Sequence, residues 1–174
     1  ARVIIKLDPT LWPAYLPVAI AELADGKIDA ARDAYARMAG TDSTGRSVSA
    51  MGLADLALYQ GRPAEARAIL EKSLAEDVRT GTTTGLISKH VALAEAWALD
   101  AKNAEALAAA KKAVAEGRDE TALLPAARIF LWADKPAEAR AFSVELQTQV
   151  QKKARAYGKV IEGEIALKER RHTA

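Results

Sequence analysis

One short phrase recurs four times along the chain, and this repetition constrains the fold more than any other feature of the sequence. It takes the form Ala-Asp-Gly-Lys-Ile-Asp-Ala-Ala-Arg in its first copy and Tyr-Gln-Gly-Arg-Pro-Ala-Glu-Ala-Arg in its second. The equivalent turn residues are Gly26, Gly61, Ala101 and Asp134, which lie 35, 40 and 33 residues apart. Periods of this length are typical of stacked helix pairs. The sequence therefore predicts an all-α repeat scaffold.

The composition agrees with helices that approach each other closely. Half of the 174 residues are hydrophobic, but only 5% are aromatic, and alanine is abundant. Alanine has the highest helix propensity, and its small side chain lets two helices come near. A chain of this length can bury one domain's worth of apolar surface.

Start and stop signals place the helices around each turn. Gly26 and Gly61 suit the left-handed conformation that ends a helix, whereas Pro63 and Pro136 suit the first turn of the next one. We expect a repeat tail at about 1–9, hairpins at about 13–39, 45–76, 84–117 and 122–148, and a half repeat at about 153–169. Residues 77–85 are poor in helix formers and are predicted to form a surface loop.

Small residues recur at fixed positions on both sides of each turn. Seven residues before it stand Ala19, Ala54, Ala94 and Ala127, and five residues after it stand Ala31, Ala66, Ala106 and Ala139. Two helices approach closely only where neither presents a large side chain. These positions are therefore expected to face each other inside the hairpins.

The period and the paired small residues together resemble the tetratricopeptide repeat family. This resemblance covers nearly the whole chain and implies a single domain over residues 1–174, folded as a right-handed superhelical array of antiparallel helix hairpins. A second, weaker resemblance concerns Met51–Ala57 and Tyr157–Lys168, which are similar to repeat regions that follow the kinase domain in some bacterial Ser/Thr protein kinases.

The first resemblance implies a binding face along the first helix of each hairpin. Carried over position by position, this face holds Leu16, Ile20, Leu23, Val48, Met51, Asp55, Leu58, Tyr59, Val91, Glu95, Leu99, Leu124, Arg128, Leu131 and Trp132. An apolar strip edged by charges is suited to a hydrophobic peptide or an amphipathic helix, with the charges setting its register. First-helix residues also pack between repeats, so part of this list is expected to be core. The candidate accessible binding residues are Asp55, Tyr59, Glu95, Arg128 and Trp132.

The residue types needed for catalysis are sparse. The chain has no Cys and two His, His90 and His172, neither with a nucleophile or metal partner at a usable spacing. It has no Gly-rich phosphate loop, no nucleophile elbow and no carboxylate cluster with metal-ligand spacing. The sequence therefore predicts no catalytic residue, no metal site and no cofactor. The lack of Cys fits either redox compartment and leaves the localisation open.

The charge balance argues against polyanionic partners. Twenty-five basic and 23 acidic residues give a net charge of +2, mixed along the sequence, and no apolar run is long enough to span a membrane. We expect no nucleic acid or membrane partner.

These observations favour a non-catalytic scaffold that mediates protein–protein interaction within a larger protein. The alternative is a regulatory or sensor segment of a bacterial signalling Ser/Thr kinase. The last helix carries Val160, Ile161, Ile165 and Leu167, which cannot all face the preceding hairpin. Self-association through this helix, or coverage by a further helix of the parent protein, is the expected consequence.

Overall fold

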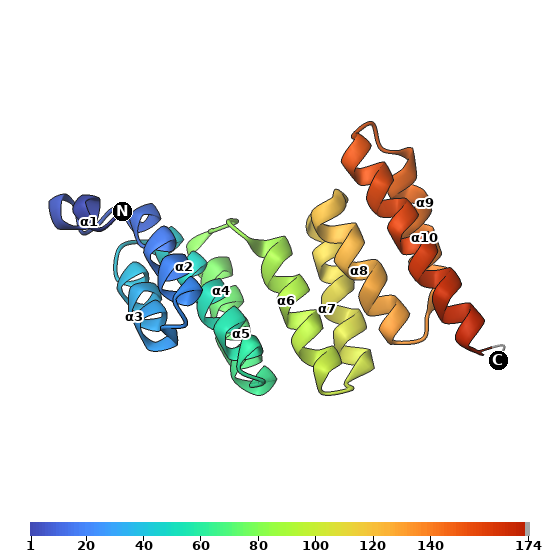
Figure 1. Cartoon of the computed structure of the whole chain (residues 1–174), viewed down its shortest axis with the longest axis horizontal. Helices are drawn as coiled ribbons and strands as arrows, with labels where there is room; N and C mark the ends of the chain where they lie inside the picture. The colour runs from blue at the N-terminus through green and yellow to red at the C-terminus, as the bar shows by residue number, and fades with distance from the viewer. Residues whose placement is uncertain (173–174) are drawn as a thin grey trace. The chain divides into compact units, whose positions relative to one another are not determined.

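The computed structural model describes residues 1–172 and the side chains of residues 1–170. This part of the chain is all-helical and contains no strand (Figure 1). The elements are α1 (Arg2–Leu7), the short 3-10 helix η1 (Trp12–Ala14), α2 (Leu16–Ala24), α3 (Ile28–Ala39), α4 (Ser43–Tyr59), α5 (Pro63–Thr80), α6 (Leu86–Leu99), α7 (Asn103–Glu116), α8 (Glu120–Trp132), α9 (Pro136–Thr148) and α10 (Lys152–His172).

The chain divides into two compact units. Unit 1 runs from Ala1 to Leu86, and unit 2 begins at Ile87 in the first turn of α6. Within unit 1, α2 packs on α3, α3 on α4, and α4 on α5. Within unit 2, α7 packs on α8, α8 on α9, and α10 on both α8 and α9. Apart from α10 on α8, these packed pairs are neighbours in the sequence, as the repeat pattern predicts.

The four turn residues predicted to be equivalent share one backbone conformation. Gly26, Gly61, Ala101 and Asp134 have φ angles of 73°, 71°, 56° and 58°, all in the left-handed region. In each turn the N–H of the following residue donates to the carbonyl five residues earlier, at 2.8, 2.8, 3.0 and 2.8 Å in chain order. This is the hydrogen bond of a Schellman helix end. The repeat register is therefore confirmed, and Ala101 and Asp134 keep the turn without glycine.

The paired small residues are buried as expected. Each of the eight alanines at these positions exposes 0 or 1% of its surface. Their burial agrees with the predicted position inside the hairpins, where a larger side chain would force two helices apart.

Several element boundaries differ from the sequence prediction by two to four residues, and two of these differences have a clear local cause. The helix expected to end at residue 76 continues to Thr80, so the connection to α6 is shorter than the predicted loop 77–85. The added turn is stabilised by Arg79, which pairs with Glu76 in the same helix, and by the Thr80 hydroxyl, which donates to the Glu76 carbonyl at 3.0 Å. The first long helix begins at Leu16 rather than 13, because a 3-10 turn that includes Pro13 precedes it.

Both units contain very close approaches at glycines, of which Gly52 and Gly158 lie inside long helices. In unit 1, a Cβ added to Gly52 of α4 would lie 2.2 Å from Cε1 of the buried Tyr35 ring of α3. In unit 2, a Cβ added to Gly158 of α10 would lie 2.7 Å from the carbonyl oxygen of Ser143 in α9. The Ser143 hydroxyl also donates to the Gly158 carbonyl at 2.7 Å. Neither position has room for a side chain.

Candidate functional site

The predicted binding residues of unit 1 all remain accessible to some degree. We call the unit-1 face the set of side chains on α2 and α4 formed by Leu16, Ile20, Leu23, Val48, Met51, Asp55, Leu58 and Tyr59. None of the eight is fully buried. Ile20 and Tyr59 expose 55% and 79% of their surface, and Leu16, Leu23 and Val48 also pack against the core of this unit. The face therefore presents apolar side chains anchored on a rigid base.

Asp55 is the acidic member of this face. It is exposed at the surface, yet the surrounding protein removes enough water from its carboxylate to raise the pKa above the usual Asp value. Its neighbour Tyr35 is buried, and burial, together with the charge of Asp55, raises the pKa of the Tyr35 hydroxyl. A cation placed opposite this carboxylate would stabilise its ionised form.

Tyr59 stands one helical turn beyond Asp55 in α4, at the end of the helix. Aromatic side chains with this exposure are effective anchors at protein interfaces, because they bury a large area at a small cost in side-chain entropy. Asp55 and Tyr59 are thus brought together by the i, i+4 geometry of one helix.

The predicted residues of unit 2 lie in a different chemical setting. The Arg128 guanidinium of α8 binds the Glu164 carboxylate of α10 through two nitrogens, with N···O distances of 2.7 and 3.1 Å. This hydrogen bonding raises the pKa of Arg128, and the nearby negative charge of Glu95 in α6 also contributes. Arg128 therefore has a fixed partner within the chain.

Sequence reasoning did not identify Glu164, although the repeat register contains the signal. Glu95, Arg128 and Glu164 each directly follow the small residue of a first helix, namely Ala94, Ala127 and Gly163. Equivalent positions in successive hairpins share one face, so alternating charges there can pair. Residues 153–169 are already predicted as a half repeat, but that prediction does not compare the charges that follow the small residues of successive first helices.

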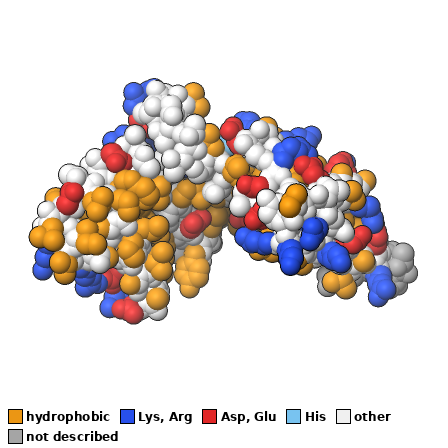
Figure 2. Space-filling model, turned by 90° about the horizontal axis from the view of Figure 1, so that it is seen from above, with side chains coloured by type: hydrophobic (Ala, Val, Ile, Leu, Met, Phe, Trp, Pro, Cys, Tyr) orange, Lys and Arg blue, Asp and Glu red, His pale blue; other side chains and the backbone are white. Residues whose placement is uncertain are grey.

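A second ion pair closes the same side of unit 2 near the end of α8. Lys168 of α10 lies 3.2 Å from Asp134 and also donates to the Leu131 carbonyl. Trp132 remains 59% exposed beside this contact, whereas Leu131, predicted as part of the face, is buried at 5% exposure and belongs to the core. Figure 2 shows hydrophobic side chains over much of the visible surface of unit 1, at the left, and more Lys and Arg on that of unit 2.

The final helix divides its apolar residues between two sides. Ile161 and Ile165 expose 0% and 1% of their surface, where α10 packs on α8 and α9. Val160 and Leu167 expose 45% and 60%. Gly163, between them, has open space where a side chain would stand. The expectation that these residues do not all face the preceding hairpin is confirmed.

The titratable groups offer little for catalysis or metal binding in the described part of the chain. His90 is half-buried, and its Nδ1 has no hydrogen-bond partner; burial and the positive charge of Lys112 lower its pKa. The side chain of His172 lies outside the described residues. Residues 1–170 contain no group of three or more His, Asp or Glu side chains placed to hold a metal ion. None of the helices described is both long and apolar enough to cross a membrane.

Comparison with known proteins identifies no relative: no protein-family model, no curated protein and no solved structure matches the chain.

Proposed function

We propose that this chain is a non-catalytic helical-repeat scaffold that binds an amphipathic helix or peptide of a partner protein on the unit-1 face. The observation that carries this proposal is an accessible apolar face with a partly desolvated carboxylate, Asp55, within it. An exposed apolar surface of this kind is a common mark of protein interaction sites. The proposed arrangement of the whole chain is the tetratricopeptide-like array, supported by the four equivalent turns and the buried alanine pairs.

The charge of the face indicates the chemistry of the partner. A Lys, an Arg or an N-terminal amine opposite Asp55 would restore the favourable electrostatics that desolvation removes from this carboxylate. Apolar side chains one turn to either side of that cation would cover Met51 and Tyr59. The proposed partner segment is therefore an apolar helix face that carries one basic residue.

A selection from a library of helical peptides tests this proposal. We expect enriched sequences to combine apolar residues at i, i+3 or i+4 and i+7 with one Lys or Arg. Binding should weaken about tenfold or more in Tyr59→Ala, because loss of an interface anchor commonly costs more than about 1.4 kcal/mol. Asp55→Asn should remove the preference for the basic residue.

Matched variants away from the face serve as controls. Val78→Ala truncates an 84% exposed apolar side chain on α5, and Val144→Ala truncates a 56% exposed apolar side chain on α9 in unit 2. Both should leave binding unchanged, and circular dichroism should show equal helicity in all variants. Enriched peptides that bind Tyr59→Ala and Asp55→Asn as tightly as the wild type would refute the proposed face.

A further inference from the structure

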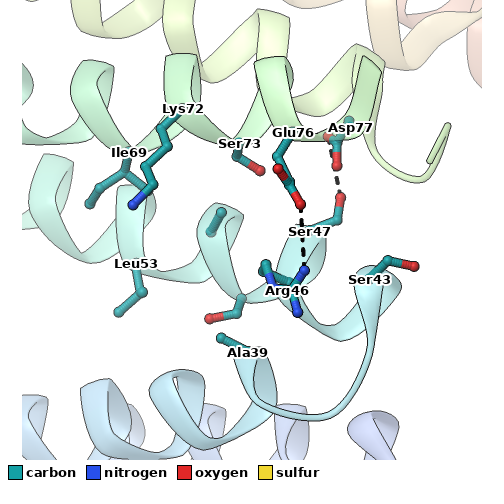
Figure 3. A pocket seen from close by; sticks show the side chains of 12 residues that line it. Ala39, Ser43, Arg46, Ser47, Leu53, Ile69, Lys72, Ser73, Glu76 and Asp77 are labelled. Carbon is teal, nitrogen blue, oxygen red and sulfur yellow. Dashed lines mark hydrogen bonds and ion pairs between the residues drawn. The ribbon is translucent and has the colours of Figure 1, made fainter. Parts of the chain in front are cut away.

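A pocket opens on the opposite side of α4 from the unit-1 face. It has a volume of about 490 Å³ and lies between the end of α3, the first half of α4 and the second half of α5 (Figure 3). Residues 46, 50 and 53 of α4 line it, whereas residues 48, 51 and 55 belong to the face; at 100° per residue the two sets lie on opposite sides of the helix. The volume is within the range of small-ligand sites.

Small residues create the pocket. Ala39 of α3, Ala50 of α4 and Ser73 of α5 line it with little side-chain volume. The hydroxyls of the lining residues Ser47 and Ser49 are bonded within the fold. Ser49 donates to the Tyr35 carbonyl at 2.7 Å, and the Ser47 hydroxyl lies 3.2 Å from the Thr84 carbonyl oxygen and 3.4 Å from the buried Asp77 carboxylate (Figure 3). These bonds fix the walls, so the space is built into the fold.

Two cations and two carboxylates line the pocket: Arg46 and Lys72 with Glu76 and Asp77. The Asp77 carboxylate is buried, and the Glu76 carboxylate lies nearer the surface. The Glu76 carboxylate already accepts two hydrogen bonds from Arg79, at 2.9 and 2.5 Å, and this bonding is the main cause that lowers the Glu76 pKa. Arg46 lies 3.6 Å from the same carboxylate, and Lys72 also acts on it through its charge. Three cations therefore share the half-buried Glu76 carboxylate, and Arg46 and Lys72 are the two of them that line the pocket and can bind a further anionic group.

The rest of the pocket is apolar. Leu53 of α4 and Ile69 of α5 are half-buried and project from the two helices into the space beside Lys72, as Figure 3 shows. In the view of Figure 3 the Lys72 side chain extends in the direction of Leu53, and both residues line the pocket. A ligand can place a charged end at the rim and an apolar end between the helices.

We propose that this pocket binds a small carboxylate that carries an apolar chain. The carboxylate pairs with the Lys72 ammonium and the Arg46 guanidinium, and the chain packs on Leu53, Ile69 and Ala50. This site is separate from the peptide-binding face and does not depend on it.

Titration of the whole chain with hexanoate, followed by amide chemical shifts in NMR, tests the proposal. We expect saturable shifts centred on Ala50, Leu53 and Ile69, and weaker binding of 1-hexanol, which has the same chain without the charge. Lys72→Gln should weaken hexanoate binding about fivefold, in line with the loss of one exposed ion pair. Lys135→Gln, at an exposed lysine of unit 2, should leave it unchanged.

A second variant tests the pocket without altering its charge. Ala50→Leu fills the space and should abolish saturable binding while the helical spectrum is retained. The proposal is overturned if hexanoate produces no saturable shifts or shifts only in unit 2. Equal binding of hexanoate and 1-hexanol, or equal binding by wild type and Lys72→Gln, would also overturn it. None of these outcomes bears on peptide binding at the unit-1 face, which the library selection measures separately.

Discussion

The two units are built from the same helical hairpin and differ in what their first helices present. In unit 1 the residues that directly follow the small position are Ile20 and Asp55, and within residues 1–170 no ion pair is found at Asp55. In unit 2 the residues at this position pair across helices, with Arg128 bound to Glu164. The buried small residues specify the hairpin in both units. The residue that follows each of them decides whether the first helix presents an unpaired side chain, as at Asp55, or an ion pair within the chain, as at Arg128.

The turns show a second difference between the units. Both anchors in unit 1 are glycine, Gly26 and Gly61, whereas unit 2 uses Ala101 and Asp134 at positive φ. A left-handed conformation costs a residue with a Cβ roughly 1 kcal/mol, and Asp tolerates it better than Ala. Unit 2 therefore holds the same turn at a higher conformational cost.

The largest expected effects come from the close glycine approaches at Gly52 and Gly158. Gly52→Ala in unit 1 and Gly158→Ala in unit 2 should each destabilise the chain by about 1 to 3 kcal/mol, because the added methyl group has no space. Hydrogen exchange should show loss of protection in α3 and α4 for the first variant, and in α9 and α10 for the second. Gly163→Ala is the matched control: its site is open, so the higher helix propensity of alanine should stabilise α10 by up to about 1 kcal/mol. Equal loss of protection in both units for either variant would show that they unfold as one.

A smaller effect is expected at the turn anchors, with opposite sign in the two units. Gly61→Ala should destabilise by about 1 kcal/mol, and Ala101→Gly should stabilise by about 0.5 to 1 kcal/mol, since only glycine adopts positive φ without strain. Chemical denaturation measures both changes in the free energy of unfolding as shifts of the midpoint, provided that the dependence of this free energy on denaturant concentration is unchanged. The anchors would not be energetically equivalent if the two substitutions shifted the midpoint in the same direction.

The smallest effect concerns the charges of the two faces. Arg128→Gln should destabilise by about 0.5 to 1 kcal/mol, because it removes a two-nitrogen ion pair that is partly exposed. A double-mutant cycle with Glu164→Gln isolates this coupling, and added salt should reduce it. A coupling energy of zero at low salt would contradict a stabilising ion pair between Arg128 and Glu164 in unit 2.

Neutralising the unit-1 face should have the opposite sign. Asp55→Asn should stabilise by about 0.5 kcal/mol at neutral pH, within the range of surface substitutions. The folded pKa of Asp55 lies above the unfolded value, so the stability that its protonation contributes is fully present below the unfolded pKa. That contribution is lost as the pH rises through the folded pKa. The advantage of Asp55→Asn should therefore vanish in acid and appear above the folded pKa; an advantage independent of pH would point to a cause other than the charge.

The candidate site was predictable in part. The repeat register places Asp55 and Tyr59 on one helix face, and their exposure agrees with that prediction. The register also contains the alternation of Glu95, Arg128 and Glu164, but their pairing depends on how closely α10 packs on α8, which the spacing alone does not define. The pocket beside Lys72 had no sequence signal, because it arises where small residues of three helices meet.

The sequence by itself determined the hairpins, their turns and the alanine pairs inside them. These features are local: helix propensity, turn conformation and the need for small residues at a helix crossing all act within about 35 residues, so they can be read from one repeat. Tertiary structure decided which of the first-helix side chains pair, which are buried and where a cavity remains. Those outcomes depend on distances between helices that belong to different repeats, and a small change in packing decides whether two side chains meet or leave space between them.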